Sequence, residues 1–261
     1  MPRRSAQSRI EPSPRASRAG APRGPDPRSR GGDCNAIRWE SEANCRHCAI
    51  RDQALFGALR GPDFERLLAP IRSAPISAGT ELYREGAAAR AVYTVRSGLL
   101  KLIKGDPEAG GRIVRLLGPG AAVGLEALSD GLYWHTAVVA RASQLCRIPL
   151  HVFADLRAHN AQLADRVVGQ WEQQVQSADR WLAELSQGTV SQRVQCLLVM
   201  LAEIDGDGGV RIQLPPMTDL ASILGTTRES VSRALAELKR AQALRRVAPH
   251  TYECDPEALS C

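Results

Sequence analysis

The sequence lacks the features of a membrane-spanning or secreted protein. It contains no run of about 18 consecutive apolar residues, which a transmembrane helix requires. Its N-terminus has no apolar stretch of the kind found in a secretory signal peptide. Its seven cysteines are too few and too scattered for a secreted disulfide scaffold. We therefore expect no membrane partner and a location in the reducing cytoplasm.

Net positive charge is small outside the N-terminus, although the whole chain carries a net charge of +6. Residues 1–33 contain eight Arg against three acidic residues, a net charge of +5, so the rest of the chain contributes only +1. The overall charge is therefore weak evidence for nucleic-acid binding. With six Pro and few large apolar side chains, residues 1–33 predict a disordered tail. This tail either contacts DNA phosphates or only improves solubility.

Three cysteines lie close together in residues 34–60. Cys45 and Cys48 form a C-x-x-C pair, and Cys34 precedes that pair by eleven residues. This spacing lets two thiolates bind one metal ion or one iron–sulfur cluster. Cys34 is a candidate further ligand, whereas His47 lies beside Cys48 with awkward geometry. A thiol–disulfide switch and a surface pair without a ligand are the alternatives.

Residues 61–150 have little helical pattern from about residue 76 onward. Glycines punctuate this region, and short apolar segments lie between them at 91–95, 99–103 and 113–117. Many short strands joined by glycine turns predict a β-sandwich or jelly roll. Cys146 lies in the last expected strand, 145–149, where a cysteine is ordinarily a small buried residue.

Helical periodicity returns in residues 151–187. Apolar residues at spacings of three or four predict a long helix with an apolar seam, formed by Leu163, Val167, Trp171, Val175, Ala178, Leu182 and Leu185. A seam on a helix between two domains indicates either a two-fold partner helix or packing on its own β domain. A further helix is expected at 190–204, with Cys196 in its apolar core.

Residues 188–261 contain two short expected helices that meet at a glycine. Thr218 is expected to cap the first helix, 219–224, and Gly225 to end it in the left-handed conformation. Thr226 and Glu229 have capping-box spacing at the start of the second helix. The second helix is amphipathic and basic, with an apolar face of Val231, Leu235 and Leu238.

The segments on both sides of this helix pair have strand character. Residues 211–214 precede it, and residues 243–253 follow it with Pro249 at an expected turn. A generic helical hairpin with a basic face shares the helix pattern. The flanking strands favour a winged helix-turn-helix, whose second helix enters the DNA major groove.

From Cys34 to about Glu257 the chain resembles the Crp/Fnr family of transcription regulators. The resemblance depends on GTELYREG at residues 79–86 and YTVRSG at residues 93–98. Within the family the chain is most similar to the Fnr branch. Cys45 and Cys48, followed by Ile-Arg at residues 50–51, look like the N-terminal cysteine motif of that branch, and residues 145–149 resemble the stretch that carries its distant cysteine. Residues 229–233, ESVSR, match the Fnr-type E-x-x-S-R pattern.

The resemblance implies an α+β fold with three parts. These are an N-terminal cyclic-nucleotide-binding-like β-roll (jelly roll), a long dimerisation helix and a C-terminal winged helix-turn-helix. It also implies a homodimeric, non-enzymatic regulator that binds TTGAT-type palindromic DNA and contacts RNA polymerase. Glu229 would accept from cytosine N4, Ser232 would contact thymine, and Arg233 would donate to guanine O6 and N7, with Arg228 beside them.

The resemblance also implies a [4Fe–4S] cluster that senses oxygen, held by Cys34, Cys45, Cys48 and Cys146. The Fnr branch usually carries its third N-terminal cysteine after the C-x-x-C pair, where this chain has Ala54 and Phe56. Cys34 would replace it, since closing a longer loop adds little entropic cost.

No cyclic nucleotide is expected. Relatives that bind one use an Arg-Ser or Arg-Thr pair, and the corresponding turn, residues 124–136, contains no arginine. A haem group that senses nitric oxide or carbon monoxide, and a zinc-bound or thiol switch, are alternative sensors. A dithiol oxidoreductase is a further alternative, but the βαβ context of such enzymes is missing around Cys45 and Cys48.

Overall fold

The computed structural model describes residues 37–39, 41–42, 48–56, 69–153, 161–205, 211–255, 258–259 and 261. The predicted tail, 1–33, and the candidate ligands Cys34 and Cys45 lie outside the described residues. Within the described residues, the helices do not combine the length and apolar character that crossing a bilayer requires.

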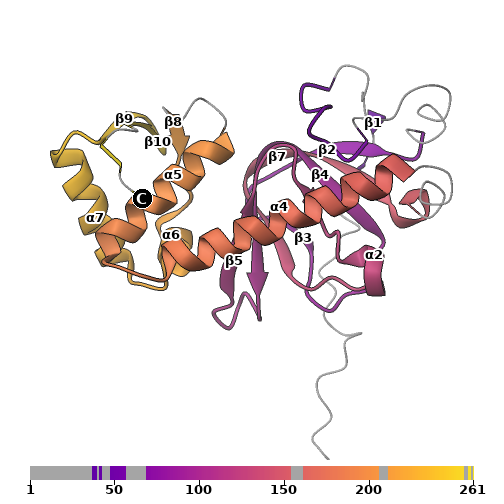
Figure 1. The fold of residues 1–261 in the computed structure, drawn as a ribbon, viewed down its shortest axis with the longest axis horizontal. Helices are drawn as coiled ribbons and strands as arrows, with labels where there is room; N and C mark the ends of the chain where they lie inside the picture. Colours follow the sequence, from indigo (N-terminus) through magenta and orange to yellow (C-terminus); the bar gives the residue numbers. More distant parts are fainter. Residues whose placement is uncertain are drawn as a thin grey trace, which may run out of the picture. The chain divides into compact units, whose positions relative to one another are not determined.

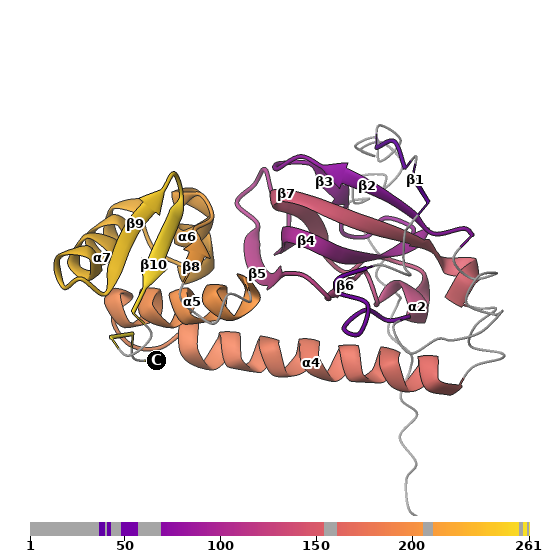
Figure 2. The same ribbon diagram turned by 90° about the horizontal axis from the view of Figure 1, so that it is seen from above.

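An antiparallel seven-stranded sheet forms the first folded part (Figures 1 and 2). Its strands are β1 (Ser41–Glu42), β2 (Arg72–Ile76), β3 (Glu81–Tyr83), β4 (Ala91–Lys104), β5 (Arg112–Leu117), β6 (Ala122–Val123) and β7 (Thr136–Pro149). β4 and β7 pair along their lengths. On its other edge, β7 pairs with β2 along one part of its length and with β3 along another. In the same way, β4 pairs with β5 along one part and with β6 along another. The sheet therefore encloses an apolar core, as a β-roll does, and the expected β architecture is confirmed.

The sequence divided β4 into two strands, 91–95 and 99–103, and this prediction was wrong. The strand is continuous from Ala91 to Lys104, with shifts of register against β7 around Gly98. Gly98 has a φ of 93°, which glycine adopts without steric cost. The glycine therefore forms a bulge inside one strand instead of a turn between two.

In the described part of the chain, three helices come before the helix-turn-helix pair, and the last of them packs with that pair in the winged unit. The short α2 (Ala127–Asp130) was not expected from the sequence and ends at left-handed Gly131. The long α4 (Ala161–Leu185) and α5 (Val190–Asp205) confirm the two predicted helices. The N-terminal half of α4 packs on the β-roll, where Leu163, Val167 and Trp171 join a cluster with Phe56 and Phe153.

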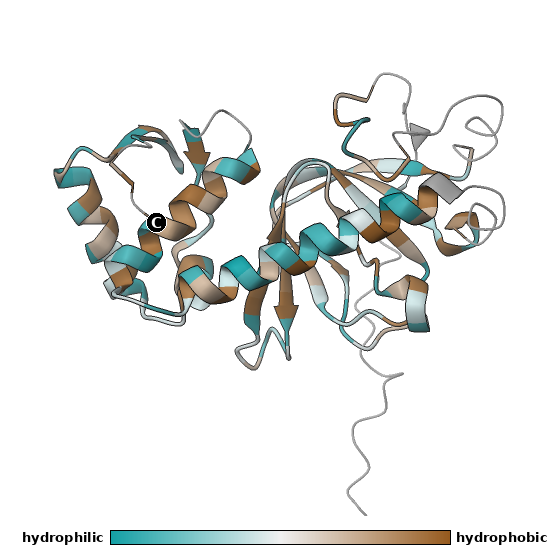
Figure 3. Cartoon of the chain, in the orientation of Figure 1, coloured by the Kyte–Doolittle hydropathy of each residue, from teal (hydrophilic) through white to brown (hydrophobic). Residues whose placement is uncertain are grey.

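The C-terminal part is a winged helix-turn-helix. It contains β8 (Arg211–Gln213), α6 (Met217–Leu224), α7 (Arg228–Arg240), β9 (Leu244–Ala248) and β10 (Thr251–Cys254). The three strands form a sheet in the order β8-β10-β9, which confirms the predicted flanking strands. The helices α5, α6 and α7 share one apolar core, and Figure 3 shows the apolar residues along α5 beside the more hydrophilic α7.

Candidate DNA-binding and sensor sites

The turn between α6 and α7 is closed by backbone hydrogen bonds. Gly225 has a φ of 57°, and its N–H donates to the Ser222 carbonyl at 3.4 Å. The Thr226 N–H donates to the Ala221 carbonyl at 3.0 Å. The predicted role of Gly225 as a left-handed C-cap is confirmed.

Both predicted N-caps were wrong, because a nearby residue is the N-cap of each helix. The first helix begins at Met217 with Pro216 as its N-cap, so Thr218 lies inside it and is not its cap. The second helix is capped by Thr227, whose Oγ1 accepts from the Ser230 N–H at 3.2 Å. Thr226 therefore does not form the expected capping box with Glu229. Adjacent threonines give the same local signal, and the residues that close the turn determine which one caps the helix.

The N-terminal half of α7 presents an exposed polar face. Arg228, Glu229, Ser232 and Arg233 are all exposed, whereas Val231, Ala234, Leu235 and Leu238 are buried. Hydrogen bonds from its own backbone N–H and from the Thr227 hydroxyl, together with the nearby charges of Arg228 and Arg233, lower the pKa of Glu229. Glu229 is therefore an ionised acceptor at neutral pH, beside a guanidinium donor on the same face.

The wing adds further exposed cations. Arg245 and Arg211 both pair with Glu253, and Arg211 Nη2 lies 3.3 Å from its Oε1. The ammonium of Lys239 lies 4.9 Å from the centroid of the Tyr252 ring. These contacts connect α7, β8, β9 and β10, so the wing is held at a fixed position beside the recognition helix.

Two of the four predicted cluster ligands can be placed. Cys48 is partly buried at the start of the turns in residues 48–56, and Cys146 is buried in β7. Among the described residues, the one group of three or more potential metal ligands is Glu184, Cys196 and Cys261, so Cys48 and Cys146 do not complete a site there.

Residues 48–56 contact both the β-roll and α4. Leu55 and Phe56 share a buried cluster with Cys146. From α4, Arg166 Nη1 donates to the Asp52 carbonyl at 2.8 Å, and Gln170 Nε2 donates to the Gln53 carbonyl at 3.3 Å. The segment that follows Cys48 is therefore packed beside Cys146 and hydrogen-bonded to the long helix.

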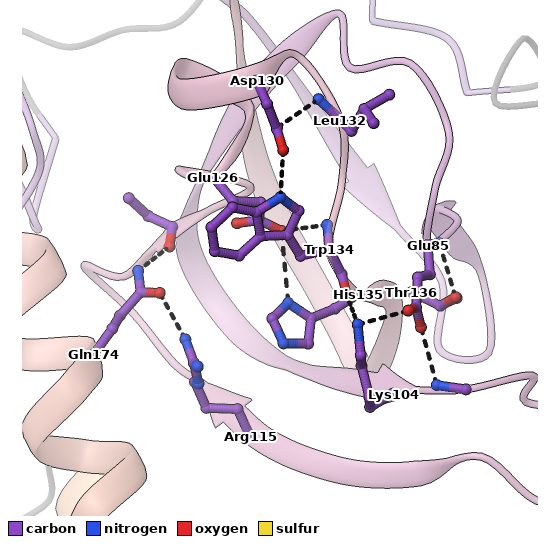
Figure 4. A network of polar contacts seen from close by, with 12 residues as sticks. Glu85, Lys104, Arg115, Glu126, Asp130, Leu132, Trp134, His135, Thr136 and Gln174 are labelled. Carbon is purple, nitrogen blue, oxygen red and sulfur yellow. Dashed lines mark hydrogen bonds and ion pairs between the residues drawn. The ribbon is translucent and has the colours of Figure 1, made fainter. Parts of the chain in front are cut away.

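Residues 124–136 form the turn that lacks the arginine of nucleotide-binding relatives, and this turn contains a network of polar contacts (Figure 4). His135 Nδ1 lies 3.6 Å from Glu126 Oε1, which also accepts from the Trp134 N–H at 3.3 Å. Burial opposes ionisation of Glu126, but His135 and the backbone donors outweigh it and lower the pKa of this carboxyl. Tyr133 stacks on Tyr83 with ring centroids 3.7 Å apart.

Arg115 connects this part of the sheet to α4. Its Nη1 donates to Gln174 Oε1 at 2.8 Å, and Gln174 Nε2 donates to the Ala122 carbonyl at 2.9 Å. Burial lowers the pKa of Arg115, and the charge of Glu126 opposes that shift. β5, β6 and α4 are therefore joined by two linked hydrogen bonds, one part-buried and one buried, which no pattern in the sequence predicts.

The apolar residues of α4 divide between two faces. Leu163, Val167 and Trp171 lie against the β-roll. Val168, Val175 and Leu182 recur every seven residues, and 55%, 54% and 67% of their respective surfaces are exposed. Val168 was missed in the sequence, because the neighbouring Val167 fits the same spacing. A seven-residue repeat is the signal that identifies it.

Two domain families match this chain. The cyclic nucleotide-binding domain matches residues 75–160, and the Crp-like helix-turn-helix domain matches residues 192–261. The transcriptional activator protein FnrA of Stutzerimonas stutzeri is 23% identical over 209 residues, which cover 78% of this chain and 86% of the relative. The fumarate and nitrate reduction regulatory protein of Vibrio cholerae is 23% identical, over 77% of this chain and 82% of its own.

Solved structures agree with the fold. FixK2 from Bradyrhizobium japonicum superimposes with a TM-score of 0.64 at 21% identity, over 72% of this chain and 95% of its own. The c-di-GMP responsive regulator CLP of Xanthomonas campestris has a TM-score of 0.59 at 19% identity, over 73% of this chain and 96% of its own. With a cyclic nucleotide-binding β-roll followed by a Crp-like helix-turn-helix, this chain belongs to the Crp/Fnr family of transcription regulators.

Proposed function

We propose that this protein is a homodimeric regulator that binds Fnr-type palindromic DNA and responds to oxygen or redox state. The observation that carries the sensory proposal is the position of residues 48–56. These residues share a buried cluster with Cys146 and are hydrogen-bonded to α4 through Arg166 and Gln170. A change at Cys48 would therefore reach the dimerisation helix through the backbone of Asp52 and Gln53.

The exposed face of α7 supplies the groups that read a TTGAT-type half-site. The ionised Glu229 accepts from cytosine N4, and the planar guanidinium of Arg233 donates to guanine O6 and N7. Ser232 contacts a thymine edge, and Arg228 lies beside the phosphates at the start of the helix. All four side chains are exposed, so DNA binding requires no rearrangement of the core of the winged unit.

The exposed stripe of α4 supplies the dimer contact. Val168, Val175 and Leu182 occupy one apolar position of a heptad repeat, and the partly buried Ala178 lies at the other apolar position between Val175 and Leu182. A parallel two-fold pair of these helices would cover the stripe and bring two recognition helices to the two halves of a palindrome. Leu163 and Val167 would support the dimer indirectly by holding α4 on the β-roll.

Cys34, Cys45, Cys48 and Cys146 are the ligands we assign to a [4Fe–4S] cluster. The two described ligands fit this assignment in chemistry, because both are thiols, and in setting, because the segment after Cys48 packs in the cluster that holds Cys146. A bound cluster would supply a centre that oxygen or nitric oxide degrades. Residues 48–56 would transmit its state to α4, in a cytoplasmic regulator that also contacts RNA polymerase.

The test begins with full-length protein purified without oxygen. About four iron and four sulfide per chain, with a broad visible absorption that bleaches in air, are expected for an intact cluster. Gel mobility on a duplex with two TTGAT half-sites is then compared before and after air. DNA binding that weakens as the absorption bleaches is the expected result.

Matched variants identify the ligands. Cys45→Ala and Cys34→Ala should lose iron, whereas Cys254→Ala should retain it, because Cys254 is buried in the winged unit. A colourless protein that still binds the duplex would remove the cluster and leave the regulator. An intense Soret band without sulfide would instead select haem, and two cysteines protected by zinc would select a zinc or thiol switch. Thiol-exchange activity without DNA binding would select a dithiol oxidoreductase.

A further inference from the structure

A second cysteine pair lies in the winged unit, far in sequence from the proposed cluster ligands. Cys196 on α5 and Cys261 are joined by a disulfide, with their Cα atoms 4.8 Å apart and a sequence separation of 65 residues. That Cα separation lies within the range that a disulfide bridges without moving the backbone. The sequence predicted only that Cys196 is a core residue, and it is buried as expected.

The two cysteines differ in accessibility. Cys196 is 8% exposed within the core shared by α5, α6 and α7, whereas Cys261 is exposed. Leu259 is buried in the same core, so this residue is held against the helices independently of the sulfur bond. An oxidant in solution can therefore reach Cys261 first, and Cys196 is already beside it.

The reduced pair would remain in place. Cys261 Sγ lies 3.2 Å from Glu184 Oε2 near the end of α4, so the thiol form can donate a hydrogen bond to that carboxylate. Cys254 is a contrasting case, because burial raises the pKa of its thiol to about 11 and it forms little reactive thiolate. Among the described cysteines of this unit, Cys261 is therefore the one that an oxidant in solution reaches first.

We propose that Cys196 and Cys261 form a reversible dithiol–disulfide site within the DNA-binding domain. In a reducing cytoplasm, disulfides are usually transient and redox-sensing. The bond closes a loop that contains α6, α7 and the wing, and it fastens the C-terminal segment to α5. The site is separate from the N-terminal cysteines and does not depend on an iron–sulfur cluster.

Oxidised glutathione, a small disulfide, is the oxidant in this step. The Cys261 thiol loses its proton to water, and its thiolate attacks one glutathione sulfur, which releases one glutathione thiolate. The Cys196 thiol gives its proton to the released glutathione thiolate, and its sulfur attacks the Cys261 sulfur of the mixed disulfide. This releases the second glutathione thiolate, which takes a proton from water. Two protein thiols are oxidised to one disulfide, and one glutathione disulfide is reduced to two thiols.

The disulfide should stabilise the winged unit. It restricts the unfolded chain over a long loop, while the folded unit already holds the two residues together. The oxidised protein should therefore melt at a temperature that is higher by at least about 5 °C. Dithiothreitol should reverse the shift completely.

The experiment uses full-length protein equilibrated with graded ratios of reduced to oxidised glutathione, quenched with acid and alkylated. Trypsin cuts after Arg193, Arg211 and Arg246, so Cys196 lies in peptide 194–211 and Cys261 in peptide 247–261. The expected product is a cross-link between these peptides that increases with oxidised glutathione. Fragmentation of peptide 247–261 distinguishes Cys261 from Cys254.

Three variants define the site. Cys261→Ser changes an exposed residue, and it should abolish both the cross-link and the melting shift. Cys254→Ala should retain both. Cys45→Ala should also retain both, which separates this proposal from the sensory function proposed above. Protein with Cys196 and Cys261 fully alkylated at every glutathione ratio would overturn the proposal. A second result would also overturn it. If the two cysteines form no cross-link and resist alkylation until a chelator is added, they belong to a metal site with Glu184.

Discussion

At the scale of single residues, Gly98 shows how one position shapes the β-roll. A Cβ atom at Gly98 would lie 2.2 Å from Ser143 Oγ and 2.5 Å from the Ala142 carbonyl oxygen. The Ser143 hydroxyl is fixed there, because it accepts from the Leu99 N–H at 3.1 Å and donates to the Arg141 carbonyl at 2.6 Å. The bulge in β4 therefore depends on a residue without a side chain.

Gly98→Ala should destabilise the protein strongly. The substitution combines an unfavourable positive φ with a steric clash against β7, and together these should lower the free energy of unfolding by about 3 kcal/mol. Gly79→Ala is the control, because Gly79 has a φ of 85° and nothing within 4 Å of the added Cβ. It should lose only about 1 kcal/mol. Urea unfolding measures both, and equal losses would show that the close approach to Ser143 is unimportant.

Glu229→Ala should weaken and broaden DNA recognition. Loss of one good base contact is expected to reduce affinity for the TTGAT palindrome by about 10- to 100-fold. Discrimination at one base pair should disappear, while the remaining positions are read as before. Fluorescence anisotropy on a set of duplexes, each changed at one base pair, measures this. Glu237→Ala, which alters another exposed glutamate further along α7, should leave affinity and specificity unchanged.

The caps of the helix-turn-helix show what the sequence could predict at this scale. The existence of both helices, their buried faces and the left-handed Gly225 all followed from local chemistry. The caps did not, because Thr226 and Thr227 are chemically equivalent in sequence. Thr226 belongs to the turn, where its N–H donates to the Ala221 carbonyl, and Thr227, one residue later, caps α7.

At the scale of secondary-structure elements, α4 has two apolar faces with different partners. One face packs on the β-roll through Leu163 and Val167, and the other presents the exposed stripe of Val168, Val175 and Leu182. The sequence predicted a single apolar seam on this helix. Residues spaced three or four apart can belong partly to one face and partly to the other, so the spacing alone does not separate the two faces. Only the position of the β-roll separates the two faces.

Val175→Asp should dissociate the dimer. A carboxylate in the middle of an apolar helix pair loses hydration without gaining a partner, so the dimer dissociation constant should increase at least about 100-fold. Sedimentation velocity measures the shift to monomer, and affinity for the palindrome should decrease with it. Gln176→Asp introduces the same charge at the neighbouring exposed residue, outside the stripe, and should remain dimeric. If both variants stay dimeric, α4 is not the dimer contact.

At the candidate sensor site, the sequence predicted the cysteines but not their connection to α4. The C-x-x-C spacing identified Cys48, and the resemblance to the Fnr branch selected Cys146. Neither could reveal that Arg166 and Gln170 of α4 hold the backbone of residues 52 and 53. Those contacts join residues more than a hundred positions apart, and a local pattern contains no information about such pairs.

At the scale of the whole molecule, one apolar core joins the β-roll to the winged unit. Leu99, Ile103 and Ile113 of the sheet share this core with helices α5, α6 and α7. A nearly buried ion pair reinforces the junction, with Lys101 Nζ 2.7 Å and 2.8 Å from the two oxygens of Asp219. Arg141 of β7 also pairs with Asp205 at the end of α5. The β-roll and the winged unit are therefore connected by packing as well as by α4.

The ion pair between Lys101 and Asp219 should couple unfolding of the two parts. Only 17% and 12% of these side chains are exposed, so removing either partner leaves a charge with little solvent. Lys101→Met and Asp219→Asn should each lower the free energy of unfolding by roughly 1–3 kcal/mol. The double variant should lose less than the sum, because the second substitution removes the charge that the first left unpaired. Urea unfolding of all four proteins gives the coupling energy.

Calorimetry then tests whether this pair matters for cooperativity. The wild-type chain should show one transition for the β-roll and the winged unit together, and the double variant should show two. Glu85→Gln is the control, because the pair of Glu85 with Lys104 has a similar distance, 2.6 Å, but is more exposed and lies within the β-roll. It should lose less than about 1 kcal/mol and keep one transition. Additive losses in the Lys101 and Asp219 variants, with one transition retained, would mean that the apolar core alone joins the two parts.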